Sequence, residues 1–167
     1  VQPVGVGCCG DVHCTGDNAA VAWGMGSENV VRVPADEAFR MRTDALSAAI
    51  AADRIAGHRP IAVVATVGTT SMTSVDPVSV IADVCEREAL WLHVDGAYGG
   101  VAGAVPELRH LLDGVDRADS FVVNPHKWLF TPMDCSVMFN RRPAVLKRAF
   151  SLFASYPETA EHPQVLH

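Results

Sequence analysis

The stretch IAVVATVG, residues 61–68, is a continuous apolar run that ends at a glycine. Runs of this length without polar alternation are typical of strands that are buried on both faces, as in parallel sheets. Strand-like and helix-like segments alternate on both sides of it. The sequence therefore predicts an α/β fold with a mostly parallel sheet flanked by helices.

Two of the expected helices have recognisable ends. Thr43 is expected to cap the first of them and Gly57 to end it, because threonine and glycine suit those positions. Asp76 is expected to cap the second, with Pro77 at its first position. Further strands are expected within residues 4–12, 29–34, 90–95, 119–124 and 135–140, and helices within 15–23, 44–58, 78–88 and 141–150.

The composition is that of a globular protein. The chain has 167 residues, of which 49% are hydrophobic and 19% charged, and its net charge is -6. No run of lysine or arginine stands out, so nucleic acid and acidic membrane surfaces are not expected as partners. No apolar run is long enough to span a bilayer. The length suits one domain with a sizeable core.

The cysteines and the start of the chain indicate the cellular setting. The five cysteines are odd in number and three of them, Cys8, Cys9 and Cys14, lie close together, so no disulfide framework is expected. Their spacing with His13 is not that of a zinc module, so no metal site is predicted. The chain starts at Val1, inside a strand-like segment and without a basic leader. We therefore expect a piece of a longer or processed cytoplasmic protein.

Polar residues follow several of the predicted strands at the point where each strand ends. Thr70 follows the run 61–68, and Asp95 ends the strand LWLHVD. The sequence NPHKWLF, residues 124–130, follows the next strand. Ligands of open α/β sheets bind at the carboxyl ends of strands, so these side chains are expected to converge. His13, after the first strand, could stack on an aromatic ring, although a lone histidine is more often structural.

Lys127 and Asp95 are the residues with the clearest chemistry. A desolvated lysine has a lowered pKa and attacks carbonyl groups, and Trp128 could exclude water from it. Asp95 could keep a pyridine nitrogen protonated. A lysine for the aldehyde and a carboxylate for the ring is the pair that pyridoxal 5'-phosphate needs. The alternatives are a solvated loop lysine and an aspartate that only caps the next turn.

Four segments in the same order resemble one known family. GDVHCTGDNAA (10–20), VVATVGTTSMTSVDPV (63–78), WLHVDGAYGGVAGAVPELRHLLDGVDRADSF (91–121) and ADSFVVNPHKWLFTPMDCSVMF (118–139) are similar to segments of the group II pyridoxal-phosphate-dependent decarboxylases, the family of aromatic-L-amino-acid decarboxylase. Many members have DAAY where this chain has DGAY. Glycine at position 96 is expected to be a mild change.

The resemblance implies a role for each matching residue. Lys127 would bind the cofactor aldehyde as a Schiff base, and Asp95 would pair with the pyridinium nitrogen. Ala97 would pack on one face of the ring and His13 would stack on the other. Thr70 would contact the cofactor or the hydrogen-bond network of the aspartate.

The resemblance also implies an activity. Asn124 and His126 would help to hold the cofactor phosphate. The substrate would be an L-amino acid, and the overall resemblance favours an aromatic one. The products would be the amine and carbon dioxide. His13 would help to position the substrate.

The same resemblance implies a partial fold-type I large domain. Residues 1–150 would form most of the cofactor-binding large domain of the pyridoxal-phosphate-dependent transferase kind, and residues 151–167 a loop that leads to sequence outside the chain. The family acts as homodimers, so the whole protein is expected to be one. Alternatives are a glutamate or other amino-acid decarboxylase, an aldehyde synthase, an aminotransferase, or an inactive fragment that contributes only sheet and interface.

Overall fold

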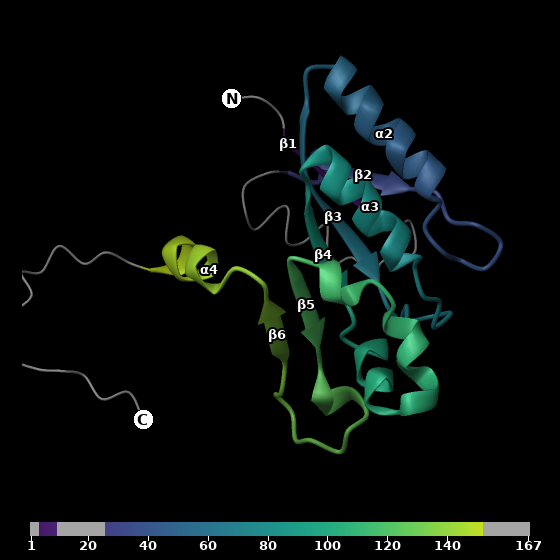
Figure 1. Ribbon diagram of the computed structural model, residues 1–167, viewed down its shortest axis with the longest axis vertical. Helices are drawn as coiled ribbons and strands as arrows, with labels where there is room; N and C mark the ends of the chain where they lie inside the picture. Colours follow the sequence, from purple (N-terminus) through teal and green to yellow (C-terminus); the bar gives the residue numbers. More distant parts are fainter. Residues whose placement is uncertain (1–3, 10–25, 152–167) are drawn as a thin grey trace, which may run out of the picture.

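A single mixed sheet forms the centre of the molecule (Figure 1). The computed structural model describes residues 4–9 and 26–151. The strand order is β2-β1-β3-β4-β5-β6, and every neighbouring pair is parallel except β5 and β6. The predicted mostly parallel α/β sheet is therefore confirmed, with one antiparallel edge strand. The strands are β1 (Val4–Cys9), β2 (Val30–Val33), β3 (Arg59–Thr66), β4 (Trp91–Asp95), β5 (Ser120–Val123) and β6 (Val137–Asn140).

The helices α2 and α3 lie over the same face of this sheet, as Figure 1 shows. Their apolar residues pack against the alternate strand residues that point to that face. The result is one buried cluster, to which α2 contributes Leu46 and Ile50, α3 contributes Ile81 and Val84, and the two central strands contribute Val63, Ala65, Leu92 and Val94. The helices are α2 (Thr43–Ile55), α3 (Val78–Glu88) and α4 (Pro143–Phe150), and the 3-10 turns are η1 (Ser27–Asn29), η2 (Gly99–Ala104), η3 (Pro106–Leu112), η4 (Val115–Arg117) and η5 (Pro125–Lys127).

The end of α2 was predicted correctly and its start was not. Gly57 has a φ of +80°, and its N–H donates to the carbonyl of Arg54 while the N–H of His58 donates to that of Asp53. This pair of bonds is a Schellman motif, which glycine at this position makes possible. The helix begins at Thr43 itself, with Arg42 as the N-cap residue, and no side chain caps it. The prediction that Thr43 is the cap is therefore wrong by one residue.

The helix α3 has the predicted bounds, but Asp76 does not cap it. Pro77 is the N-cap residue and makes no side-chain bond. The carboxylate of Asp76 instead accepts the N–H of Met41 at 2.7 Å and the N–H of Thr66 at 2.8 Å. The side chain is buried, and this burial raises the pKa of Asp76, although the two N–H donors oppose the shift. One carboxylate thus ties the segment before α2 to the end of β3.

Some predictions concern residues outside the described part of the chain. The predicted helix at 15–23 and His13 lie there, as do residues 10–12 of the first predicted strand and all of the predicted loop 151–167 except Ser151. Across the described residues, no helix combines the length and the apolar character that crossing a bilayer requires.

We predict that Asp76→Ala lowers the free energy of unfolding by about 3 kcal/mol, because two buried N–H groups lose their acceptor. Urea unfolding of the whole protein measures the change. Asp113→Ala is the matched control, because it also removes one carboxylate but at an exposed position. It should change the free energy of unfolding by less than about 0.5 kcal/mol. Equal effects of the two substitutions would contradict the structural role of Asp76.

Candidate active site

The carboxyl ends of β3, β4 and β5 lie side by side at one edge of the sheet. The register pairs Thr66 with Asp95 and Asp95 with Val122. Two further bonds continue the pairing past the strands: the N–H of Val67 donates to the carbonyl of Asp95 at 2.8 Å, and the N–H of Gly96 donates to that of Val122 at 3.0 Å. The predicted convergence of these strand ends is therefore what the structure shows.

Asp95 is half-buried at this edge and uses one of its two carboxylate oxygens locally. Its Oδ1 accepts the N–H of Ala97 at 2.9 Å. Through this bond Asp95 caps the turn that follows β4, which is the alternative role that the sequence allowed for it. Its Oδ2 has no hydrogen-bond partner among the described residues. A negatively charged acceptor at a strand end is thus left for a donor from a ligand.

Thr66 is a residue of this edge that the sequence analysis did not single out. Its Oγ1 is the one buried side-chain polar atom without a hydrogen-bond partner in the described part of the chain. In the register it stands beside Asp95, on the same face of the sheet. A buried hydroxyl without a partner is costly, so this atom suits a bond to a bound molecule. The sequence feature that could have identified Thr66 is a threonine at the end of an apolar strand.

The segment that holds Lys127 lies against the segment that follows Asp95. The N–H of Asn124 donates to the carbonyl of Ala97 at 3.1 Å, and the N–H of Lys127 donates to that of Asn124 at 3.0 Å. The indole of Trp128 donates to the carbonyl of Tyr98 at 2.6 Å and stacks on the Tyr98 ring, with the ring centroids 5.5 Å apart. The structure therefore brings the predicted residues of 95–97 and 124–127 to one place.

Lys127 itself is exposed in this chain. The expectation that Trp128 removes it from water is not met, because the indole is 43% exposed and packs on Tyr98 instead. No ion pair joins Lys127 to Asp95 among the described residues. In this chain Lys127 thus has the exposure of the solvated loop lysine that the sequence allowed as an alternative, and its amine has no carboxylate partner in the part of the chain that the structure describes.

The side chains of Asn124 and His126 make bonds within the loop after β5. Asn124 Oδ1 accepts the hydroxyl of Ser136 at 2.7 Å. His126 Nδ1 lies 2.7 Å from the carbonyl oxygen of Cys135 and 3.1 Å from its amide nitrogen, so the backbone of Cys135 orients the ring. Their role toward a phosphate stays a prediction.

Two further predicted site residues are not joined to this cluster by a described contact. Thr70 is exposed, whereas its neighbour Thr69 is buried and bonds to Ser74 through its hydroxyl. His13 lies outside the described residues. Within those residues, no group of three or more His, Cys, Asp or Glu side chains is placed to hold a metal ion. The cluster Cys8, Cys9, His13 and Cys14 falls partly beyond them.

Glycines allow the backbone segments at this edge to approach each other closely. A Cβ atom at Gly99 would lie 2.4 Å from the carbonyl oxygen of Val67. A Cβ atom at Gly96 would lie 2.4 Å from Cε2 of Phe121. An alanine at position 96 would therefore require the ring of Phe121 to shift. That glycine here is a mild change from the alanine of many family members stays a prediction.

The chemistry of this donor set fits pyridoxal 5'-phosphate. Asp95 offers a free carboxylate oxygen for a protonated ring nitrogen, and Lys127 offers an amine for an aldehyde. Ala97 and the glycines leave backbone that a flat ring can approach. The two polar groups come from neighbouring segments at one edge of the sheet, the usual ligand position in open α/β folds.

Known proteins share both the sequence and the fold. The chain matches the pyridoxal-dependent decarboxylase conserved domain over residues 2–165. It is 47% identical over 132 residues to aromatic-L-amino-acid decarboxylase of Sus scrofa. The aligned region covers 79% of this chain and 27% of that protein. The crystal structure of mouse CSAD in apo form has a TM-score of 0.92 at 36% identity and covers 99% of this chain and 34% of that one.

A plant enzyme is similar as well. The crystal structure of Oryza sativa TDC with PLP has a TM-score of 0.83 at 40% identity, over 87% of this chain and 31% of that one. These matches confirm the resemblance drawn from the four sequence segments and the fold class expected from it. The chain spans about a quarter to a third of the length of the relatives it matches.

We predict that Gly96→Ala lowers the free energy of unfolding by about 2 kcal/mol, because the added methyl group overlaps the ring of Phe121. Adding Phe121→Leu should recover about 1 kcal/mol of this loss, which a double-mutant cycle by urea unfolding measures.

Gly57→Ala is the control for this cycle. A Cβ atom at Gly57 meets no atom within 4 Å, so the cost of that substitution comes from its φ of +80° alone. The loss in free energy of unfolding caused by Gly57→Ala should be the same with phenylalanine or leucine at position 121. Additive effects of the substitutions at 96 and 121 would contradict the steric coupling.

Proposed function

Because this chain belongs to the pyridoxal-dependent decarboxylase family, we propose that the whole protein removes the α-carboxylate of an L-amino acid as carbon dioxide. The observation that carries the proposal is the placement of Asp95 and Lys127 on adjoining segments at one edge of the sheet. Pyridoxal 5'-phosphate is the proposed cofactor. The activity is proposed for the whole protein, since the chain is only part of the length of its relatives.

The cofactor, when bound, supplies a protonated aromatic ring that withdraws electrons from the bond to the departing carboxylate. The residues of this chain hold it in place for that purpose. The free Oδ2 of Asp95 would accept the ring N–H and, as a charged acceptor, would keep that proton in place. The bond from Ala97 to Oδ1 fixes the direction of the carboxylate.

Lys127 would hold the cofactor covalently through its amine. The bond from its N–H to Asn124, together with the contact of Trp128 with Tyr98, fixes the backbone on both sides of Lys127. The flexible side chain then reaches from a fixed position, which limits the entropy lost on attachment.

Six further residues complete the proposed cofactor and substrate contacts. Ala97 would pack on one face of the ring and His13 would stack on the other, where it would also help to position the substrate. Asn124 and His126 hold the phosphate. Thr70 contacts the cofactor or the network around Asp95, to which we add the free hydroxyl of Thr66.

An aromatic L-amino acid is the proposed substrate. The support is the 47% identity to an aromatic-L-amino-acid decarboxylase. Incubation of the whole protein with L-tryptophan, L-tyrosine and L-glutamate tests this, with carbon dioxide, amine, aldehyde and keto acid measured together. Equal amounts of carbon dioxide and aromatic amine are expected. A keto acid, an aldehyde, or turnover of L-glutamate alone would contradict the proposal.

We also propose that the whole protein is a homodimer in the cytoplasm. The support is a set of exposed apolar side chains close to Lys127 in sequence: Phe130 is fully exposed, and Met133 is 82% exposed. Apolar side chains this exposed are common where another chain covers them. Light scattering of the whole protein should give twice the mass of one chain, and a monomer at micromolar concentration would contradict the proposal.

We predict that Lys127→Ala abolishes covalent attachment of the cofactor and leaves the fold intact, because the side chain is exposed. The measurement is the visible absorption of the whole protein with pyridoxal 5'-phosphate, before and after borohydride. Lys147 is the other lysine of this chain, so Lys147→Ala is the matched control and should keep the band. Retention of the band in the Lys127→Ala protein would refute the role of Lys127.

We predict that Asp95→Asn lowers the rate of decarboxylation roughly 100-fold or more, the size of effect seen when one preorganised polar contact to a reacting centre is lost. Asparagine keeps an oxygen for the Ala97 N–H, so the turn is retained while the charge is lost. Nitrogen NMR of labelled cofactor should show that the ring nitrogen has lost its proton. An active variant with a protonated ring would overturn the role of Asp95.

A further inference from the structure

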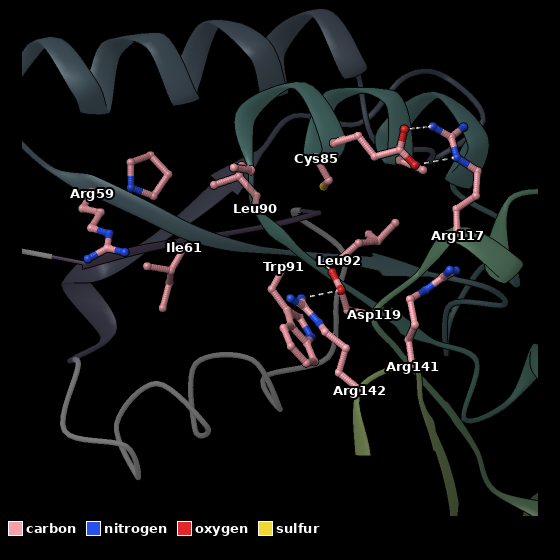
Figure 2. A pocket seen from close by; sticks show the side chains of 14 residues that line it. Arg59, Ile61, Cys85, Leu90, Trp91, Leu92, Arg117, Asp119, Arg141 and Arg142 are labelled. Atoms are coloured by element: carbon pink, nitrogen blue, oxygen red, sulfur yellow. Dashed lines mark hydrogen bonds and ion pairs between the residues drawn. The ribbon is translucent and has the colours of Figure 1, made fainter. Parts of the chain in front are cut away.

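The sheet face opposite the helices α2 and α3 carries a row of three side chains from β4. Leu92 and Val94 lie in the buried cluster that these helices cover. Trp91, His93 and Asp95 are half-buried and point to the opposite face, because side chains alternate along a strand. Figure 2 shows Trp91 and Leu92 on opposite sides of β4. His93 therefore stands between Trp91 and Asp95, about 7 Å along the strand from each.

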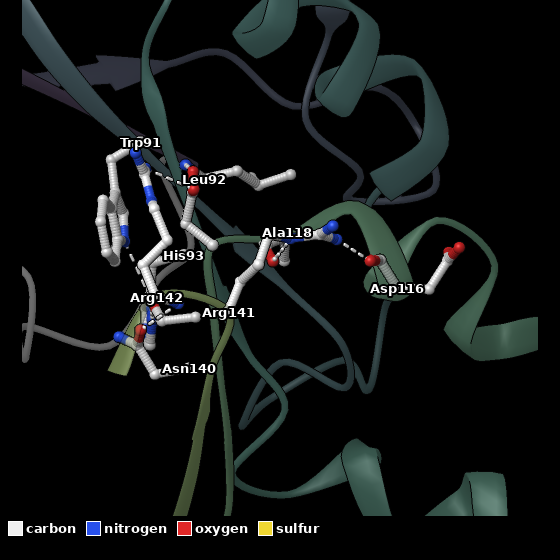
Figure 3. Close-up of polar contacts among 10 residues, drawn as sticks. Trp91, Leu92, His93, Asp116, Ala118, Asn140, Arg141 and Arg142 are labelled. Carbon is white, nitrogen blue, oxygen red and sulfur yellow. Dashed lines mark hydrogen bonds and ion pairs between the residues drawn. The ribbon is translucent and has the colours of Figure 1, made fainter. Parts of the chain in front are cut away.

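Hydrogen bonds to the neighbouring strand hold His93 in place. Ser120 of β5 is paired with His93 in the register. Its hydroxyl oxygen lies 2.8 Å from Nδ1 of His93 and 2.9 Å from Nε1 of Trp91 (Figure 3). Ser120 is buried, with 6% of its surface exposed. The three side chains therefore form one short chain of hydrogen bonds on this face of the sheet.

The indole of Trp91 sets the direction of these bonds. An indole nitrogen can only donate, so the oxygen of Ser120 accepts the bond from Trp91. The single hydroxyl hydrogen of Ser120 then has one acceptor among the described residues, Nδ1 of His93. The reverse arrangement would leave this buried hydrogen without an acceptor, which costs free energy. The network therefore favours the neutral tautomer of His93 that carries its hydrogen on Nε2.

The surroundings of His93 oppose a positive charge on its ring. Burial lowers the pKa of His93, and the negative charge of Asp95 partly offsets this shift. A proton on Nδ1 would also turn the hydroxyl of Ser120 away from its acceptor. The imidazole is therefore mainly neutral at neutral pH, although it stands beside a carboxylate.

Asp95 is the charged residue that faces His93. The register neighbours of His93 on this face are Val64 of β3 and Ser120 of β5, and Asn140 of β6 is paired with Ser120. None of these three side chains titrates. The charge of Asp95 is therefore the main electrostatic influence on His93 in the part of the chain that the structure describes.

The nearby charges at the start of β4 compensate each other. The guanidinium of Arg142 lies 4.8 Å from the centre of the Trp91 ring and donates from Nη2 to Oδ1 of Asp119 at 2.6 Å. Asp95, in contrast, has no ion-pair partner among the described residues. Its negative charge is therefore shared between His93, if that ring is protonated, and any ligand at the carboxyl edge.

We propose that His93 is a positioning residue that acts through Asp95: it is held neutral so that the negative charge of Asp95 is reserved for the cofactor ring. This inference rests on the proposed function, in which Asp95 pairs with the protonated ring nitrogen. A cation at position 93 would compete with that nitrogen for the carboxylate, and the two positive charges would repel each other. A neutral imidazole leaves the carboxylate to one partner.

Nitrogen NMR of the whole protein, labelled at histidine and titrated with acid, tests this proposal. Without cofactor, His93 should show an unprotonated Nδ1 and a protonated Nε2 at neutral pH. Asp95→Asn should lower the pKa of His93, because it removes the attracting charge. Loading with pyridoxal 5'-phosphate should also lower the pKa of His93, since the charge of Asp95 is then paired with the ring nitrogen.

The Asp95→Asn protein separates this effect from the exclusion of water. Loading should shift the pKa of His93 much less in that protein, because no charge at position 95 remains to be taken up. An equal shift in both proteins would mean that the cofactor acts on His93 only through burial. That result, a proton on Nδ1 in the neutral ring, or no effect of Asp95→Asn without cofactor would overturn the proposal.

His58 is the matched control in the same spectra. It is an exposed histidine whose Nδ1 lies 3.4 Å from a carboxylate oxygen of Asp53, at the end of α2. Its signals are identified by their loss in His58→Gln. Neither Asp95→Asn nor cofactor loading should change the pKa of His58, and a change equal to that of His93 would contradict a local effect.

Two substitutions at position 93 test the consequence for the reaction. His93→Lys places a cation beside Asp95 and should lower kcat about tenfold or more, the effect expected when a hydrogen bond to a charged group is lost. His93→Gln stays neutral and should retain kcat. Equal values of kcat in the two variants would contradict the proposal.

The same experiments distinguish failure of this inference from failure of the proposed function. If the unsubstituted protein does not take up cofactor, the proposed function is wrong. The comparison of the Asp95→Asn and unsubstituted proteins without cofactor then still decides whether His93 and Asp95 are coupled.

Discussion

Parallel pairing of β3, β4 and β5 in one register is the constraint on which the rest of the structure depends. It places Thr66, Asp95 and Val122 side by side, and the segments that leave these strands then carry the polar groups to one edge. Side chains alternate along a strand, so a slip of one residue would turn Asp95 to the opposite face. The helices α2 and α3 oppose such a slip because it would expose the buried residues Leu92 and Val94.

The fold was largely predictable because its signals are local. The apolar run 61–68 and the glycine at 57 act through their own backbone, and both were placed correctly. Asp76 shows where local rules fail. An aspartate before a proline suggests a helix cap, but its carboxylate bonds instead to Met41, which is distant in sequence. No pattern within a few residues could reveal that bond.

The candidate site was predictable to the same extent. Asp95 and Lys127 could be singled out by their positions at strand ends, whereas the exposure of Lys127 depends on which segments pack above it. The close fit of Gly96 depends on the ring of Phe121 on the neighbouring strand. Such pairwise fits between segments appear only in three dimensions.

The most direct test of the account is amide hydrogen exchange of the whole protein with and without pyridoxal 5'-phosphate. Bound cofactor should slow exchange at the carboxyl edge, in the segments 95–100 and 124–128, because contacts there suppress local opening. Exchange around Arg59 and Trp91 should be unchanged. Slowed exchange at the amino edge, with none around Asp95 and Lys127, would contradict the claim that the converging strand ends form the cofactor site.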